Sequence, residues 1–474
     1  MATRLSPQHP PVGSLQSHRG SVGVVLAAAL VTGCTLSNTS EGGTDGLNVE
    51  PRGQQPSERS IELLLDPGEN PLAALAEIEV EDRNVLATGN FAVGLMMTEL
   101  GSYFSADTLY QPSSVAAQSD QCQGSTLPDA VEVVCGIINP PQEEGEGGEG
   151  EEVEAEAQFL FIDESPTLAQ HRVTGRRLLE CARAAGFQYF VIEALGEPAA
   201  ALAERGYVSR SESGVFLREP QFAGLVEDAL SLGFQPISLP PDEFCADCTP
   251  VEAFSRSAEP KADSLIQQTV DVDPSAKVLV WTGPGQAFEQ PWGPRPFVNS
   301  LASHVFEKTG INPYTLIQQT LEPRASLGPT PESGIYLASG PDNGSCSGSY
   351  SPGSANGLST HDGTLIHVAP PVGSSGSDAE RWAWLHTPPE NRMGVTPECA
   401  SCAAGQRLLV QAFSPGVDVA DRVPADQALC SAGDTCQLAL PAGDYQLVVW
   451  SDAMQLTTTQ VTLAAGAATS VTMN

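Results

Sequence analysis

The sequence is poor in basic residues and lacks three motifs of well-known enzyme classes. Of 474 residues, 22 are lysine or arginine and 58 are aspartate or glutamate, which gives a formal net charge of −36. Nucleic acids and anionic membrane surfaces attract basic proteins, so binding to either is disfavoured. No Gly-x-Ser-x-Gly elbow or Walker A motif occurs, and no Gly-x-Gly-x-x-Gly follows a strand-like run. Serine hydrolase and nucleotide-binding chemistry are therefore disfavoured, and we expect no cofactor.

Long apolar runs are also missing. The longest candidate, Val22 to Val31, is too short to span a bilayer and follows a leader with arginine but no acidic residue. It ends in Val-Thr-Gly-Cys and resembles a bacterial lipoprotein signal peptide, residues 1–34. The resemblance implies lipidation of Cys34, and Thr35 after it points to the outer membrane. The protein would then contact the membrane through its lipid anchor only. The alternative is a chance match in an N-terminal tail.

Eleven cysteines leave ten once Cys34 is set aside. Exported chains form disulfides, and four close pairs suggest themselves. They are Cys122 with Cys135, Cys245 with Cys248, Cys399 with Cys402, and Cys430 with Cys436. The two Cys-x-x-Cys motifs also suit a zinc site, although some 150 residues separate them. Cys181 lies in a helical pattern and is interpreted as a buried free thiol, with Cys346 left over.

Composition divides the rest of the chain. Residues 35–60, rich in Ser, Gly, Asn and Pro, are interpreted as a flexible tether, and residues 61–142 as an N-terminal α+β region of unclear fold. Residues 143–157 form a glycine-glutamate run that cannot bury apolar surface, so we interpret them as a linker. Weak calcium binding by this run is an alternative, although an Asp-x-Asp loop is missing.

Residues 158–400 alternate strand-like and helical patterns. Strand-like runs at 158–163, 187–193, 234–239 and 277–283 are separated by helical stretches, which are expected at 168–185, 220–232, 261–270 and 298–309. This rhythm predicts an α/β fold with a largely parallel sheet flanked by helices. From 405 to 474 the pattern changes to period-two alternation, which predicts a small C-terminal antiparallel β-sandwich.

Candidate site residues follow the first strand-like run. Phe159 to Ile162 are apolar and predict a buried strand, after which Asp163 and Glu164 stand where the ligand-facing residues of an α/β sheet emerge. Histidine, the usual proton carrier near neutral pH, is missing from the positions directly after them. His361, Asp362 and His367 are an alternative metal cluster. Because His367 falls within a strand-like run, we favour a structural role for it. We therefore predict no metal site.

The α/β stretch, about 158–320, resembles the superfamily of erythromycin esterase, the ChaN haem-binding lipoproteins and TraB-type proteins, especially an exported branch of bacterial proteins. In that branch the first strand ends in a motif like Asn-Glu-Ala-His-His, followed by His-Arg. Here the register reads Asp163-Glu164-Ser165-Pro166-Thr167, then His171-Arg172. Further matching elements are Phe190, Glu193 and Leu195 on the second strand, Arg205-Gly206-Tyr207, Glu219-Pro220, and residues 306–320.

Two departures bear on function. Pro166 and Thr167 replace the paired histidines, and Gln286 stands where a Gly-x-x-His-like motif places a histidine. The resemblance therefore implies a noncatalytic domain that binds a small molecule or envelope component, or acts as a scaffold, with Asp163, Arg172, Arg205 and Gln286 as candidate ligand-binding residues.

Three alternatives stay open. One is an ester or lactone hydrolase that uses Glu164, Glu193 and His171, since carboxylates in different environments can share acid and base work. Another is haem or metal capture. In the plainest structural interpretation, Glu164 caps the following helix, Glu193 pairs with Arg172 or Arg205, and His171 is a satisfied structural histidine.

Overall fold

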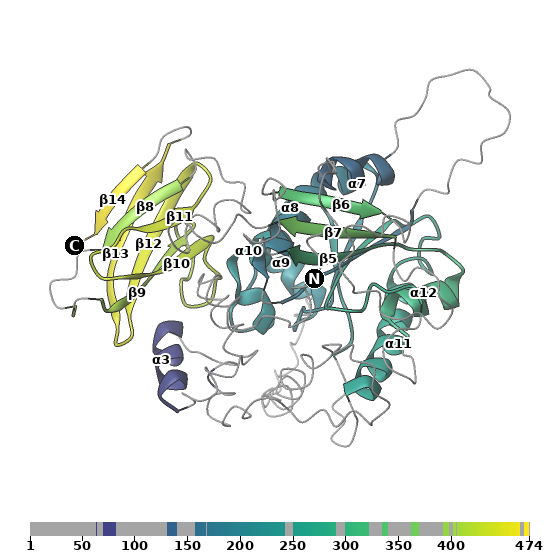
Figure 1. The fold of residues 1–474 in the computed structure, drawn as a ribbon, viewed down its shortest axis with the longest axis horizontal. Helices are drawn as coiled ribbons and strands as arrows, with labels where there is room; N and C mark the ends of the chain where they lie inside the picture. The colour runs from purple at the N-terminus through teal and green to yellow at the C-terminus, as the bar shows by residue number, and fades with distance from the viewer. Residues whose placement is uncertain are drawn as a thin grey trace, which may run out of the picture.

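The computed structural model describes residues 63, 70–81, 130–139, 157–166, 168–241, 250–290, 299–321, 334–339, 362–368, 392–397, 402–403, 405–464 and 469–473. These residues form an α/β unit and a C-terminal β unit that lie side by side (Figure 1). The predicted tether, residues 143–156 of the predicted acidic linker, and several residues singled out above lie outside the described residues: Cys34, Cys122, Cys245, Cys248, Cys346, His361 and Cys399.

A seven-stranded sheet forms the centre of the α/β unit, in the order β3-β2-β4-β1-β5-β7-β6. Every neighbouring pair is parallel except β6 with β7. The strands are β1 (Phe159–Asp163), β2 (Tyr189–Ile192), β3 (Gln235–Ser238), β4 (Val278–Thr282), β5 (Tyr314–Leu321), β6 (Gly334–Ser339) and β7 (Gly363–Val368). All five residues of β1 and of β4 are buried, as expected for parallel strands covered on both faces. The predicted α/β architecture with a parallel sheet is confirmed.

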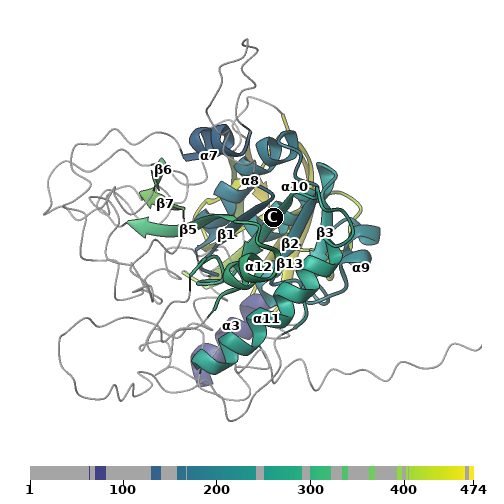
Figure 2. The same cartoon turned by 90° about the vertical axis from the view of Figure 1, so that its right-hand side faces the viewer.

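Helices cover both faces of this sheet (Figure 2). On one face, α7 (Ala130–Ile138), α8 (Ala169–Ala184) and α10 (Pro220–Ser231) pack against side chains such as Leu160 and Ile162. On the other, α11 (Pro250–Gln268) and α12 (Leu301–Thr309) pack against Phe159 and Phe161. Short α9 (Ala199–Arg205) and the 3-10 turn η3 (Val215–Arg218) connect β2 to α10. Alternate β1 residues thus serve opposite hydrophobic clusters.

The C-terminal unit contains two sheets. One is antiparallel, in the order β10-β9-β12-β13, and the other has the order β11-β8-β14. The strands are β8 (Arg392–Pro397), β9 (Arg407–Phe413), β10 (Asp426–Ser431), β11 (Cys436–Ala439), β12 (Gly443–Ser451), β13 (Gln455–Leu463) and β14 (Thr469–Met473). Met393 and Leu438 of the smaller sheet share one buried cluster with Val410 and Leu447 of the larger. On the other side, α3 (Pro71–Glu81) packs against Leu409 and Phe413.

The β9–β10 loop fastens the two units together. Val423 is buried within the hydrophobic cluster of the α/β unit. The Asp421 carboxylate accepts hydrogen bonds from the hydroxyls of Tyr207, Ser209 and Ser211 at 3.0, 2.5 and 3.0 Å. Arg422 forms a 2.7 Å ion pair with Glu227 on α10. This seam therefore combines apolar burial with several polar contacts between the two units.

Several predictions are corrected. Cys181, expected to be a free thiol, forms a disulfide with Cys135, because α7 packs directly along α8. The predicted pairing of Cys135 with Cys122 is therefore wrong. Cys430 pairs with Cys436 as predicted, and Cys402 is disulfide-bonded.

Two boundaries also differ. Helix α11 begins at Pro250 and contains Pro260, whereas the helix was expected only over residues 261–270. Strand β8 pairs with β11 and β14, so the C-terminal unit begins before residue 400. None of the described helices is long and apolar enough to cross a membrane.

The disulfide between Cys135 and Cys181 yields a stability prediction. The bond closes a loop between residues 46 positions apart, which restricts the unfolded chain and stabilises the fold by about 2–4 kcal/mol. The double variant Cys135→Ser/Cys181→Ser should unfold at a lower urea concentration than the oxidised wild type. An equal midpoint for the two proteins would show that this bond contributes no stability.

Candidate functional site

The carboxyl ends of β1, β2 and β4 bring the predicted site residues to one edge of the sheet. Asp163 closes β1 beside Thr282 of β4, and Glu193 follows β2. The β1 connection runs through α8 on one face of the sheet, and the β4 connection through α12 on the other. Such a divergence is where α/β sheets bind ligands. The fold therefore places Asp163, Glu164 and Glu193 where a site is expected.

Asp163 is buried and held by backbone groups. Its carboxylate accepts the N–H of Gln318 at 2.9 Å and, at 3.4 Å, the N–H of Gly285. Burial raises the pKa of Asp163 to about 7, against the opposing effect of these two hydrogen bonds. Asp163 therefore exchanges its proton near neutral pH, although both oxygens serve to join β1 to β5 and to the loop after β4.

Glu164 belongs to a buried three-residue ion cluster. Arg172 on α8 donates from Nε at 2.8 Å and from Nη2 at 3.1 Å to Glu164, and from Nη1 at 2.9 Å to Glu219. The side chains of Glu164, Arg172 and Glu219 are 4%, 0% and 1% exposed. Arg172 also lies 4.7 Å from the ring centroid of Phe222. The cluster thus joins β1, α8 and the start of α10.

Charge states in this cluster follow from geometry. Burial alone would lower the pKa of Arg172, but the charges of Glu164 and Glu219 outweigh burial and raise that pKa above the ordinary arginine value. Burial raises the pKa of Glu164 while Arg172 opposes the increase. Because arginine keeps its proton, the two hydrogen bonds that it donates favour an ionised Glu164. Glu219 additionally accepts the N–H groups of Gln221 and Phe222 and caps α10.

Glu193 has a cationic partner that the sequence did not suggest. The Lys261 ammonium on α11 lies 2.7 Å from Oε1 of Glu193, and the other oxygen accepts the Gly283 N–H at 2.7 Å. The predicted pairing of Glu193 with Arg172 or Arg205 is therefore wrong, as is helix capping by Glu164. Lys261 lies in α11, within the stretch 261–270 that was expected to be helical, but residue spacing did not indicate its contact with Glu193.

His171 is fully buried and faces β7. Its Nδ1 accepts the Ser165 N–H at 3.1 Å, so the proton of the neutral ring resides on Nε2, which has no hydrogen-bond partner. The ring stacks on that of His367, with centroids 4.7 Å apart. Burial lowers the pKa of His171 well below its ordinary value, and the neighbouring His367 and Arg172 lower it further. His367 in turn lies 3.0 Å from Oε1 of Gln318, a proximity that strand alternation alone did not reveal.

The two remaining candidates have structural contacts. Oε1 of Gln286 accepts the N–H of Leu301 at 2.9 Å and so fixes the start of α12. Arg205 is ion-paired with Glu197 and Glu212 beyond β2, away from the other candidates. The structure thus assembles Asp163, Glu164, His171, Arg172, Glu193 and Gln286 around one sheet edge, but not Arg205. Within the described part of the chain, no group of three or more His, Cys, Asp or Glu side chains could hold a metal ion.

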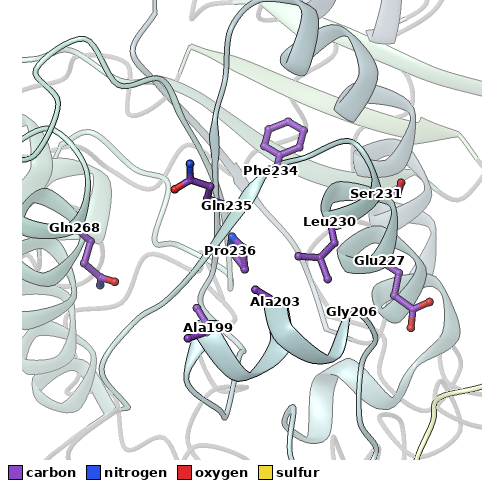
Figure 3. Close-up of a pocket in the computed structure, with 11 residues that line it drawn as sticks. Ala199, Ala203, Gly206, Glu227, Leu230, Ser231, Phe234, Gln235, Pro236 and Gln268 are labelled. Carbon is purple, nitrogen blue, oxygen red and sulfur yellow. The ribbon is translucent and has the colours of Figure 1, made fainter. Parts of the chain in front are cut away.

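A groove lies elsewhere, along the free edge of β3. Its volume is about 700 Å³, which is within the range of small-molecule sites. Figure 3 shows α9 and α10 lining it on one side, with Gln268 of α11 on the other. The lining residues are Ala199, Ala200, Ala203, Gly206, Glu227, Leu230, Ser231, Phe234, Gln235, Pro236 and Gln268.

Comparisons with known proteins do not assign a family. No family model and no curated protein matches the chain. Among solved structures, one described as "Bacterial protein toxins" is similar over 49% of this chain at 13% identity with a TM-score of 0.27. The match spans 46% of that toxin chain, less than half its length. The type III effector HopBA1 is similar over 44% of this chain and 88% of its own, at 11% identity and a TM-score of 0.24. Likenesses this weak carry no argument about fold or function.

The buried ion cluster makes a stability prediction for Glu164→Gln. The substitution removes one charge from a fully desolvated pair and should lower the free energy of unfolding by about 3–5 kcal/mol. The matched control is Asp228→Asn on α10. This variant breaks a partly exposed ion pair with Arg176, which lies on α8 as Arg172 does, and should lower the free energy of unfolding by about 1 kcal/mol or less. Chemical denaturation measures both. Equal losses in the two variants would contradict a special role for the buried cluster.

His171 predicts a pH dependence of stability. Because its folded pKa lies below the unfolded value of 6.5, it stabilises the fold above pH 6.5 relative to more acidic conditions, and this stability is lost as the pH falls. Asp163, with a folded pKa of about 7 against 3.8, contributes stability that is full below pH 3.8 and lost as the pH rises towards 7. The two effects oppose each other in the wild type.

The variant His171→Asn removes the titration of this histidine and keeps Asp163. The difference in unfolding free energy between the wild type and this variant should shrink below pH 6.5, by up to about 1.4 kcal/mol per pH unit. Denaturation between pH 5 and 8 measures it. Leu179→Ala, a buried and nontitrating change on the same helix, should differ from the wild type by a constant amount. A constant difference for His171→Asn as well would contradict the assignment.

Proposed function

We propose that the chain is a noncatalytic, lipid-anchored protein of the bacterial cell envelope whose α/β unit binds a ligand or acts as a scaffold. The observation that carries the proposal is the engagement of Glu164 by Arg172 through two hydrogen bonds in a fully buried cluster. A carboxylate held in this way cannot take up a proton from water or attack a substrate without breaking the cluster.

The neighbouring groups support the same conclusion. Glu193 is occupied by Lys261 and the Gly283 N–H. The proline and glutamine at the superfamily's histidine positions neither titrate nor accept a proton. We therefore propose that the chain is a degenerate member of the erythromycin esterase and ChaN-like superfamily, with a C-terminal β-sandwich formed by the two sheets around their shared cluster.

Anchoring is proposed from the sequence. The Val-Thr-Gly-Cys motif at Cys34 resembles a lipobox, and the pairing of Cys135 with Cys181 and of Cys430 with Cys436 fits an oxidising compartment. We place the protein at the outer membrane on the basis of Thr35.

A hydrolase with altered machinery is the second candidate. Asp163, with a pKa raised by burial to about 7, and the partnerless Nε2–H of His171 favour it, because groups that titrate near neutral pH serve in acid and base catalysis. In this candidate the working acid would be Asp163 rather than Glu164.

The deciding experiment measures turnover of an ester and lactone panel by the chain from residue 35 onward, beside Asp163→Asn and Glu193→Gln. We expect no turnover above the level of the variants. Turnover by the wild type that disappears in Asp163→Asn, with the variant still folded by circular dichroism, would establish the hydrolase and refute the noncatalytic proposal.

A further inference from the structure

The groove beside β3 has an apolar floor and a single charged group at its rim. The floor comes from Ala199 and Ala203 of α9, Leu230 of α10, and Phe234 with Pro236 along the strand. Glu227 is the one charged lining residue, and its side chain is 24% exposed. Ser231, Gln235 and Gln268 add uncharged polar groups to the lining, and apolar surface with a few polar groups is the arrangement found in small-molecule sites.

The Glu227 carboxylate has capacity for a further donor. Its Oε1 accepts the Val208 N–H at 3.1 Å, and Oε2 accepts Nη2 of Arg422 at 2.7 Å. A carboxylate offers about four lone-pair positions, so two contacts leave room for a ligand N–H. The carboxylate is also oriented by these two contacts, which lowers the cost of fixing it on binding.

The groove is poorly suited to an added β-strand. Gln235 directs its N–H towards Gln188 beside β2, so in this parallel pairing Pro236 and Ser238 face the free edge. Pro236 has no N–H to donate, and the Ser238 carbonyl already accepts Nε2 of Gln268 at 3.4 Å. An extended peptide would therefore find few backbone partners at this edge, which favours a small molecule.

We propose that this groove binds a small amphipathic amine, with its apolar body along α9 and β3 and its ammonium group at Glu227. The inference rests on the ligand-binding form of the proposed function and names the chemical class of ligand. Charge complementarity supports it, because a chain with a formal net charge of −36 attracts cations.

Binding at Glu227 also reaches the second unit. Arg422 belongs to the β9–β10 loop, which inserts Val423 into the core of the α/β unit. An ammonium group at Glu227 shares its carboxylate with Arg422, so the ligand contacts the charge pair that joins the units. The contact between Glu227 and Arg422 could not be predicted from the sequence, because the two residues are 195 positions apart.

The experiment uses three probes with one apolar body and different head groups: 4-phenylbutylamine, 4-phenylbutanol and 4-phenylbutyrate. Titration calorimetry of the chain from residue 35 onward should show the amine binding most tightly and the carboxylate most weakly. In Glu227→Gln, which keeps an acceptor for Val208, amine affinity should fall about tenfold or more, because a charged hydrogen-bond acceptor is lost. Affinity for the alcohol should change little.

Two further variants locate the site. Glu204→Gln removes the same charge from an exposed position on α9 outside the groove lining and should leave amine affinity unchanged. Ala203→Phe fills the groove and should weaken every probe, with Ala200→Leu as the substitute if the first variant does not fold.

Four outcomes would overturn the proposal: no binding of the amine, equal affinity for amine and alcohol, equal losses in Glu204→Gln and Glu227→Gln, or undiminished binding in both groove-filling variants. If the amine does not bind and no ester turnover is found, the noncatalytic proposal still holds. Ester turnover together with amine binding would refute the noncatalytic proposal and leave the groove assignment intact.

Discussion

The buried contact of Arg172 with Glu164 and Glu219 is the constraint on which the α/β unit depends. Its three residues come from the end of β1, the first turn of α8 and the cap of α10. Charges buried this deeply are tolerated only when every partner is in place. The cluster therefore fixes how α8 and α10 lie over the sheet, and the burial of Phe222 beneath Arg172 extends the same arrangement into the hydrophobic core.

The same constraint determines what the sheet edge can do. In an α/β sheet the strand ends usually present side chains to a ligand, yet here Glu164, Glu193 and Gln286 each hold a helix or loop in place. These three side chains are thus engaged in contacts within the protein. Burial raises the pKa of Asp163 and lowers that of His171.

Local pattern predicted the sheet but not its long-range partners. Strands β1 and β4 were evident because parallel strands buried on both faces are continuously apolar. The side-chain partners depend on tertiary packing that no spacing encodes. Cys181 meets Cys135 only because α7 lies along α8, and Lys261 of α11 contacts Glu193, which lies 68 positions earlier in the chain. Asp163 and Glu164 could be predicted as site residues because they directly follow the apolar run of the first strand in the sequence.

The contacts in the seam attach the C-terminal unit closely to the α/β unit. Interfaces between domains of one chain are usually polar, whereas here Val423 is 3% exposed inside the α/β core, and Asp421 accepts three hydroxyl hydrogen bonds. Detaching the C-terminal unit would expose Val423 and leave Glu227 without its arginine. Since Glu227 also lines the groove beside β3, the charge at the rim of that groove is oriented by the C-terminal unit. All the residues that line the groove belong to the α/β unit, so the C-terminal unit bears on it through the contact of Arg422 with Glu227.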